Sequence, residues 1–354
     1  MYEQAILRPT LSLSLLLTAA LFFLPLLGIS GTAALPMVSV EPPAVSAPQS
    51  APAPAPMPET PAPIILPAEE DSPDEGRTLR VLRGKEAVTM TLAEYLRGVV
   101  RAEMPASFHP EALKAQAVAA RTYTLYKLAG GGGHDGADIC TDPACCQAWT
   151  AEDAARENWG SMAEDYETKI RAAVSETDGQ TMFYGGKPIL AAFHASSSGL
   201  TRLAGQVWQS DLPYLRPASS PEQGENIPNY YSRAVFSAAE FRTAVLAACP
   251  EADLSGDLHL WLQNAVTDGA GNVDTLEVGG VRMRGSRLRG ILGLRSACFD
   301  WAVEGGQLVF YVTGHGHGVG MSQYGANAMA NGGADWQEIL RHYYADISIH
   351  SFTP

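Results

Sequence analysis

The sequence predicts an α+β fold of helices and short antiparallel strands. Some segments carry apolar residues at helical spacing, as residues 92–100 do. Others are short, apolar and followed by a glycine pair, as residues 180–184 are, which is typical of an antiparallel strand. The two kinds of segment do not alternate in the regular β–α–β order that a parallel sheet requires. We therefore expect mixed elements, and we find no internal repeat.

Residues 11–29 form an apolar segment without a charged side chain. At about 1.5 Å per residue, a helix of this length can just cross a bilayer core of roughly 30 Å. We predict that residues 1–31 form a single-pass transmembrane anchor, with Arg8 on the cytoplasmic side. The alternative is a cleaved signal peptide with its cleavage site near residues 32–34. Both interpretations place the rest of the chain outside the cytoplasm.

Residues 32–77 read as a linker rich in proline and alanine, with APAPAPMPETPAP at its centre. Prolines at this density are incompatible with a helix or a sheet. We expect either an extended, polyproline-like spacer of about 3.1 Å per residue or a disordered tether without a defined reach. The folded domain is expected to occupy residues 78–354.

The domain should open with a strand pair and a helix. Residues 79–82 and 87–90 are two short apolar segments on either side of a glycine turn, which indicates paired strands. Thr91 and Glu94 have the Thr-x-x-Glu spacing of a capping box, so a helix should begin at Leu92.

A sharp turn should separate this helix from a second one. Pro105 cannot continue a helical hydrogen-bond ladder, so the first helix should end at residues 102–103. Pro110 suits the first position of the next helix, which we expect at residues 110–128. The glycines at 130–133 should stop it.

The remaining elements follow from periodicity and from glycine and proline positions. We expect helices at residues 170–174, 236–248, 282–292 and 335–343, a hairpin of residues 180–184 with 189–193, and further strands at residues 258–266, 273–278 and 308–312.

Composition excludes one class of partner. The chain has 354 residues, is 46% hydrophobic and carries a formal net charge of −14. A general nucleic-acid binder would present a basic face, so we expect no nucleic-acid partner. An acidic protein can still bind neutral glycans, which need stacking and hydrogen bonds more than charge.

Glu103 is the candidate acid. It stands at the C-terminal end of the first predicted helix, beside the turn at Pro105. The negative end of the helix dipole disfavours an ionised carboxylate there, so the pKa of Glu103 should rise. A glutamate at a helix end is also an ordinary surface residue, and position alone leaves both interpretations open.

A metal site is predicted on the loop after the second helix. His134, Cys140 and Cys146 follow the pattern H-x5-C-x5-C, and histidine and cysteine are the usual zinc ligands. Cys145 could replace Cys146, although the spacing favours Cys146. A disulfide is the alternative outside the cytoplasm, but the five cysteines of the chain cannot all pair.

Three stretches resemble the stage II sporulation protein D family, the SpoIID/LytB domain. They are EMP with HPEALKAQAVAARTY from Glu103 onward, FHASSSGLT from Phe193 and GHGVGMSQYGA from Gly316. They occur in the order of the family, and the resemblance runs from about Thr78 to the C-terminus. Ser198 stands where the family usually has glycine, which leaves the loop geometry there open.

By this resemblance the domain is a peptidoglycan lytic transglycosylase with Glu103 as its catalytic residue. Such an enzyme needs one carboxyl group, which protonates the bond between N-acetylmuramic acid and N-acetylglucosamine and then deprotonates the muramoyl C6 hydroxyl. The product has a 1,6-anhydro end. The resemblance also implies zinc at His134, Cys140 and Cys146, and because the reaction consumes no water we expect the zinc to be structural.

The resemblance also implies a biological setting. The protein would sit in the membrane that engulfs the forespore, with its domain on the extracytoplasmic side, and degrade septal wall. Its substrate would be peptidoglycan glycan strands stripped of stem peptides. Its partners would be stage II sporulation protein P, an amidase, and the membrane protein stage II sporulation protein M.

The same motifs supply candidates for a glycan-binding groove. The residues that we expect to bind substrate are Lys114, Arg121, His194, Ser197, His317, Gln323 and Tyr324. Several have alternatives. Arg121 could form a structural ion pair, His194 with Ser197 could suggest a hydrolase triad, and His315 with His317 could bind a metal.

A function of another class remains open. The resembled family includes amidase enhancers, so the domain could be a non-catalytic, glycan-binding activator of a cell-wall amidase. A zinc hydrolase is a third possibility. Glu103 separates the first two, because a pure activator has no need of a titrating carboxylate.

Overall fold

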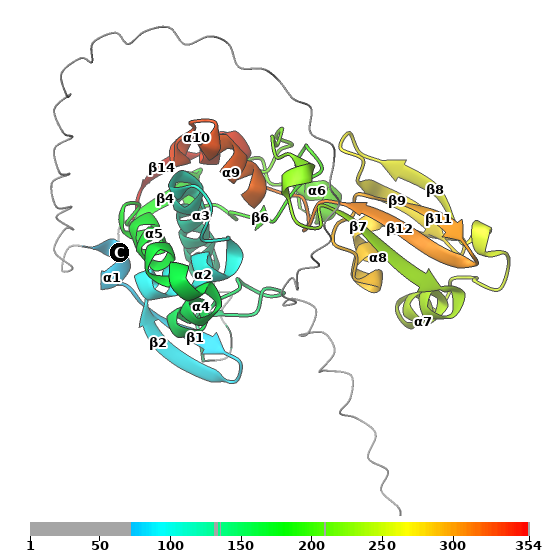
Figure 1. Ribbon diagram of the computed structural model, residues 1–354, viewed down its shortest axis with the longest axis horizontal. Helices are drawn as coiled ribbons and strands as arrows, with labels where there is room; N and C mark the ends of the chain where they lie inside the picture. Colours follow the sequence, from blue (N-terminus) through cyan, green and yellow to red (C-terminus); the bar gives the residue numbers. More distant parts are fainter. Residues whose placement is uncertain (1–71, 131–133, 135, 209, 353–354) are drawn as a thin grey trace, which may run out of the picture. The chain divides into compact units, whose positions relative to one another are not determined.

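The structure is a computed structural model that describes residues 72–130, 134, 136–208 and 210–352 (Figure 1). The predicted membrane segment at residues 11–29 and the proline-rich tract lie outside these residues. Within the described part of the chain, no helix is long and apolar enough to cross a membrane.

Helices and strands are mixed, as predicted for an α+β protein. The described residues form two hydrophobic clusters. The first gathers apolar side chains from residues 79–215 and 319–352, and the second gathers those from residues 241–312. The second cluster is therefore an insertion in the chain that builds the first, a division that the sequence left undecided.

The first sheet confirms the predicted strand pair. Strands β1 (Thr78–Arg83) and β2 (Glu86–Thr91) pair antiparallel, and β3 (Ile139–Cys140) adds to β1 in parallel. A short helix, α1 (Pro73–Gly76), precedes β1. It lies in the segment assigned from sequence to the linker, and Asp74 within it is buried.

Two helices carry the first motif and match their predicted limits. Helix α2 (Leu92–Glu103) begins with the predicted capping box, in which both reciprocal hydrogen bonds between Thr91 and Glu94 are present. Helix α3 (Pro110–Ala129) follows the turn at Pro105 and has Pro110 at its first position. Helix α3 is the centre of the first cluster, where it contacts α2, α5 and α9 (Figure 1).

Helices α4 (Glu152–Trp159) and α5 (Ala163–Ser175) are longer than the single predicted segment at residues 170–174. A 3₁₀ turn, Gly160–Met162, joins them. Only Ala155 is buried in α4, so its sequence has no apolar stripe to reveal it. Its outer surface carries ion pairs, such as Arg156 with Glu152.

The predicted hairpin at residues 180–193 is only half correct. Strand β4 (Gln180–Tyr184) is present, but its hairpin partner is the short β5 (Lys187–Pro188), and β14 (Ser348–Ser351) pairs with its other edge. Residues 189–192 leave the sheet. Strand β6 (Phe193–His194) instead pairs in parallel with β13 (Met321–Ser322).

The second cluster contains two three-stranded sheets, in the orders β10-β9-β8 and β11-β12-β7 (Figure 1). Its elements are β7 (Tyr231–Ser237), α7 (Ala238–Ala248), β8 (Leu262–Thr267), β9 (Val273–Val278), β10 (Val281–Arg284), α8 (Gly285–Leu292), β11 (Phe299–Glu304) and β12 (Gln307–Thr313).

Three boundaries predicted for this cluster were wrong. The helices expected from residues 236 and 282 begin at Ala238 and Gly285, because strands β7 and β10 run directly into them. The strand expected from residue 258 begins at Leu262, after the 3₁₀ turn Leu258–Leu260.

Two helices complete the first cluster after the glycine-rich motif. Helix α9 (Gln323–Asn331) was not expected, because it buries small residues and Gln323 rather than an apolar stripe. Helix α10 (Trp336–Tyr343) matches its prediction and is capped by Asp335. The remaining short elements are α6 (Ala204–Val207) and the 3₁₀ turn Gly224–Asn226.

Candidate active site and metal centre

Glu103 is the last residue of α2, as the capping box and Pro105 predicted. Its side chain is half-buried, and the backbone N–H of Ala148 donates to Oε1 at 2.9 Å. Burial raises the pKa of Glu103 above that of an ordinary glutamate, and hydrogen bonds from Ala148 and the Gln323 side chain offset part of this rise. The carboxyl group is therefore tuned toward its protonated form.

The raised pKa has a consequence for stability. A carboxyl group whose pKa is higher in the folded state than in the unfolded state stabilises the fold below its unfolded pKa and loses that contribution as pH rises through its folded pKa. Glu103→Gln should therefore gain stability relative to the parent chain as pH rises from about 4 to about 8. Denaturant unfolding of both proteins across this range measures the difference, and a difference that is constant with pH would contradict the raised pKa.

The structure brings the three motif segments together. Strand β6, from the second motif, pairs with β13, from the third. The backbone N–H of His109, in the first motif, donates to Asn327 Oδ1 of α9 at 2.8 Å. Gln323 Nε2 donates to Gln116 Oε1 of α3 at 3.4 Å, and its side chain also bonds to Glu103. Gln323 thus connects the third motif to the candidate acid.

Tyr324 and a pocket lie next to this junction. The Tyr324 ring packs edge-on against Phe108, with ring centroids 4.9 Å apart. Both rings line a pocket of about 470 Å³ together with Glu222, Asn327 and other residues of α9 and of the segment after Ser220. Aromatic rings beside amide and carboxylate groups are suited to a sugar.

His194 and His317 lie close together, with ring centroids 5.6 Å apart. Burial lowers the pKa of His194 to about 4 and that of His317 to about 3, so both are neutral near pH 7. His194 Nδ1 lies 3.2 Å from the Val319 carbonyl, and His317 Nδ1 accepts from the Val319 N–H at 3.1 Å. The Nε2 atom of His194 is buried without a protein partner among the described residues.

Ser197 contacts a carboxylate that the sequence analysis missed. The backbone N–H and the hydroxyl of Ser197 donate to Glu222 Oε1 at 2.7 and 3.0 Å, and the Ser322 hydroxyl donates to the same atom at 2.8 Å. The hydroxyl of Ser197 therefore points to Glu222 rather than to His194, which speaks against a hydrolase triad. Glu222 stands in an irregular segment outside every motif, and nothing in the sequence pattern distinguished it.

Arg121 and Lys114 are already paired within the protein. Arg121 is fully buried and binds Asp74 of α1 through Nε and Nη2, with the Nη2 contact at 2.5 Å. Its remaining donors reach the carbonyl oxygens of Gln180 and Val174. Arg121 thus forms the structural ion pair that was its alternative, and we no longer assign it to substrate. Lys114 pairs with Glu111 and Glu176.

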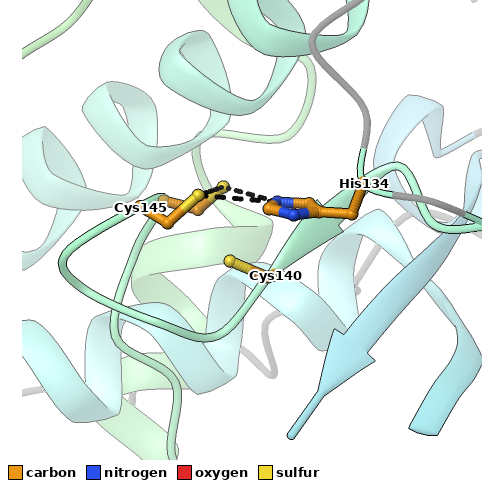
Figure 2. Close-up of side chains that lie close together, drawn as sticks. His134, Cys140 and Cys145 are labelled. Atoms are coloured by element: carbon orange, nitrogen blue, oxygen red, sulfur yellow. Dashed lines mark hydrogen bonds between the residues drawn. The ribbon is translucent and has the colours of Figure 1, made fainter. Parts of the chain in front are cut away.

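The predicted metal ligands form a compact cluster, which Cys145 joins (Figure 2). One donor atom from each of His134, Cys140, Cys145 and Cys146 lies within 4.8 Å of all the others. His134 Nε2 is 3.3 Å from Cys146 Sγ and 3.8 Å from Cys145 Sγ, and the two sulfur atoms are 3.9 Å apart. All five cysteines are free, so the structure contains no disulfide in this loop.

These separations fit a tetrahedral metal ion. Ligand bonds of about 2.0–2.3 Å around zinc place neighbouring donors roughly 3.5–3.8 Å apart. The cluster could therefore hold a metal with one histidine and three cysteines. Strand β3 fixes Cys140 against β1, and a turn in which Cys145 and Cys146 donate to the Asp142 carbonyl gathers the adjacent pair.

The metal loop leads directly to Glu103. Gln147 follows Cys146, is buried, and accepts from the Thr124 hydroxyl at 3.1 Å. The next residue, Ala148, donates to Glu103 Oε1. The loop that carries the cluster therefore also presents the hydrogen-bond donor of the candidate acid.

Comparisons with known proteins identify the family of the chain. A family model described as "Stage II sporulation protein" matches residues 83–184, which include Glu103 and the His/Cys cluster. Stage II sporulation protein D of Bacillus amyloliquefaciens is 37% identical over 260 residues, which is 73% of this chain and 74% of the relative. The chain belongs to the stage II sporulation protein D family. The same protein of Bacillus subtilis is 36% identical over 260 residues, with the same coverage.

This member of the stage II sporulation protein D family also shares sequence with a protein of another description. An "Amidase enhancer" of Bacillus subtilis is 26% identical over 304 residues, which span 73% of this chain and 40% of that relative. The recognition made from the three motifs is thus confirmed at the level of the family.

Proposed function

We propose that this member of the family is a peptidoglycan lytic transglycosylase, with Glu103 as its acid and base. The observation that carries the proposal is the setting of Glu103. It is a half-buried carboxyl at a helix end, its pKa is raised by burial, and the N–H of Ala148 holds it in place. A general acid that works near neutral pH requires a raised pKa of this kind.

The proposed reaction uses this one carboxyl group twice. Protonated Glu103 gives its proton to the glycosidic oxygen as the bond between C1 of N-acetylmuramic acid and that oxygen breaks. The carboxylate then takes the proton of the muramoyl C6 hydroxyl as that oxygen bonds to C1. Glu103 ends protonated, the muramoyl residue ends as a 1,6-anhydro sugar, and no water is consumed. A single titrating carboxyl group is therefore sufficient for both proton transfers.

We propose that the glycan strand lies over the junction of the three motifs. Tyr324 and the pocket of about 470 Å³ would bind a sugar ring, and Gln323 would orient the Glu103 carboxyl. His194, Ser197 and His317 would shape the wall of this groove, since they lie in the backbone segments paired through β6 and β13. Lys114 remains a candidate for substrate binding only through the exposed part of its side chain.

We propose zinc as the metal of the His134 cluster, in a structural role. Four protein ligands make a closed site, which is typical of structural zinc and leaves no open position for a reacting water. When bound, the ion would cross-link the loop that ends at Ala148. His134, Cys140, Cys145 and Cys146 would hold it.

Removing the metal should destabilise the protein. A strong chelator is expected to lower the melting temperature of the full-length chain by several degrees, because the ion binds only the folded loop. It should leave the melting temperature of a Cys140→Ser/Cys146→Ser variant unchanged. Thermal melts with and without chelator, after metal analysis of the purified protein, make this measurement. Loss of strand cleavage at an unchanged melting temperature would contradict a structural role.

The proposed cellular setting follows from the family. We propose that residues 1–31 hold the protein in the cell membrane, with the domain on the extracytoplasmic side, where it degrades septal wall during engulfment in endospore formation. Stage II sporulation proteins P and M would be its partners. The amidase would act on the same wall and supply the stripped strands that this enzyme would then cleave.

An amidase activator remains the second candidate, because one relative is an "Amidase enhancer". One experiment distinguishes the two functions. Purified peptide-free glycan strands are incubated with the full-length chain in detergent, and both soluble fragments and bound strands are measured. Release of fragments by the parent chain but not by Glu103→Gln, with equal binding, supports the transglycosylase. Binding without release by either protein supports the activator.

A further inference from the structure

Two arginines beside the glycine-rich motif have no carboxylate partner in the part of the chain that the structure describes. Arg295 follows α8, and its carbonyl accepts from the Gly316 N–H at 2.8 Å, which ties it to the motif. Arg289 lies within α8, and its Nε donates to the Leu294 carbonyl at 3.1 Å. Among the described residues, no ion pair forms at either guanidinium, whereas nearby Arg202 pairs with Asp268 at 2.9 Å.

Only some of the hydrogen-bond donors of the Arg295 side chain have partners. Its Nη2 donates to His315 Nδ1 at 3.1 Å, and its Nε is buried without a partner among the described residues. Burial lowers the pKa of both Arg295 and Arg289, since no carboxylate compensates it. Burial and the two arginine charges also lower the pKa of His315 to about 4, so this histidine is neutral. The result is a locally positive site in a chain of net charge −14.

The positive site is connected to Tyr324 through the backbone of the motif segments. His315, which Arg295 contacts, exchanges two backbone hydrogen bonds with Ser196, and the carbonyl of the preceding Ala195 accepts from the Tyr324 N–H at 3.0 Å. Tyr324 follows Gln323, whose side chain bonds to Glu103. The segment that carries His315, the partner of Arg295, is therefore tied by backbone hydrogen bonds to the start of α9, where Tyr324 lines the pocket proposed for a sugar. Half-buried guanidinium groups without counter-ions are costly, and an anionic ligand would relieve that cost.

We propose that Arg295, with Arg289 beside it, binds the carboxylate of the lactyl group on C3 of N-acetylmuramic acid. This inference rests on the proposed function, because it assumes that the substrate is a muramoyl glycan. The lactyl group is a free carboxylate only where the stem peptide has been removed, and is otherwise a neutral amide. A guanidinium bonds a carboxylate through two parallel charge-assisted hydrogen bonds, which an amide cannot accept. Arg295 thus makes the site selective for peptide-free strands.

The test compares two ligands that differ only at the lactyl group. One is the tetrasaccharide of alternating N-acetylglucosamine and N-acetylmuramic acid with free lactyl carboxylates. The other is the same tetrasaccharide with the carboxylates converted to methylamides. Calorimetric titration of the full-length Glu103→Gln chain should show that the acid form binds at least about tenfold tighter, since a charged hydrogen bond is worth that much.

The Arg295→Gln change in the same background should remove this preference by weakening binding of the acid form, while binding of the methylamide form stays the same. Arg282→Gln is the matched control, because Arg282 is an exposed arginine on β10 that only bonds to Thr275. It should keep the preference. Circular dichroism and melting temperatures establish that each variant is folded.

The outcomes separate this inference from the proposed function. Equal binding of the two ligands by the Glu103→Gln chain overturns the inference, whether or not the parent chain cleaves strands and whether or not Arg295→Gln folds. A preference that survives in folded Arg295→Gln overturns the role of that residue. Selective binding without any cleavage by the parent chain would reject the transglycosylase and leave Arg295 as a carboxylate-binding residue.

Discussion

Glu103→Gln is expected to slow cleavage of peptide-free glycan strands by about 10²–10⁴-fold, the usual effect of losing a general acid or base. Glutamine keeps the shape of the side chain and can still accept from the Ala148 N–H. It can neither give nor take a proton at the glycosidic oxygen. Initial rates of fragment release by the two full-length proteins, at equal concentration, measure the effect. Strand binding and the folded state should be preserved.

Glu94→Gln is the matched control for this change. Glu94 lies on the same helix and is exposed, and its carboxylate accepts from the Thr91 N–H in the capping box. Glutamine also serves at this position of a capping box, so the helix should persist. Cleavage by Glu94→Gln should equal that of the parent chain. An equal loss of rate in both variants would mean that the effect comes from helix α2 rather than from the acid.

Asp74→Asn is expected to destabilise the domain by about 3–5 kcal/mol, the typical cost of removing one partner from a buried ion pair. Asp74 and Arg121 are both buried, and Asp74 accepts from Nε and Nη2 of the guanidinium. Asparagine would leave the arginine charge enclosed without a counter-ion. The free energy of unfolding, from urea titration followed by circular dichroism, measures the loss.

An exposed ion pair provides the comparison. Glu304 pairs with Arg233 at 2.8 Å on the surface of the second cluster. Glu304→Gln should therefore leave the unfolding free energy nearly unchanged, because both side chains are exposed and solvent screens their attraction. Similar small effects for Asp74→Asn and Glu304→Gln would show that α1 does not stabilise the domain. A chain that begins at residue 78 should be destabilised like Asp74→Asn, since it also lacks Asp74.

Local signals in the sequence were sufficient for the limits of the first helices and for the position of Glu103 at the end of α2. A capping box and two prolines act within a few residues, so the limits of α2 and α3 followed from chemistry that the sequence shows directly. Helices α4 and α9 were missed because the first buries only Ala155 and the second packs through small residues. Neither arrangement produces an apolar stripe.

In the candidate site, too, local features could be predicted from the sequence and long-range contacts could not. The spacing of His134, Cys140 and Cys146 predicted a cluster within one loop, and only the position of Cys145 needed the folded turn. Contacts between residues distant in sequence could not be predicted from the sequence. Asp74 meets Arg121 across 47 positions, and Glu222 meets Ser322 across 100. Such pairs are set by the topology of the chain, and no local pattern marks them.

The chemical nature of the new strand ends tests the central claim most directly. Peptide-free strands are incubated with the full-length chain and with Glu103→Gln, and the products are analysed by mass spectrometry. The proposed mechanism predicts 1,6-anhydro-muramoyl ends from the parent chain and none from the variant. Reducing ends from the parent chain would contradict it, because they require a water molecule that this mechanism does not use, and would direct attention to the metal cluster instead.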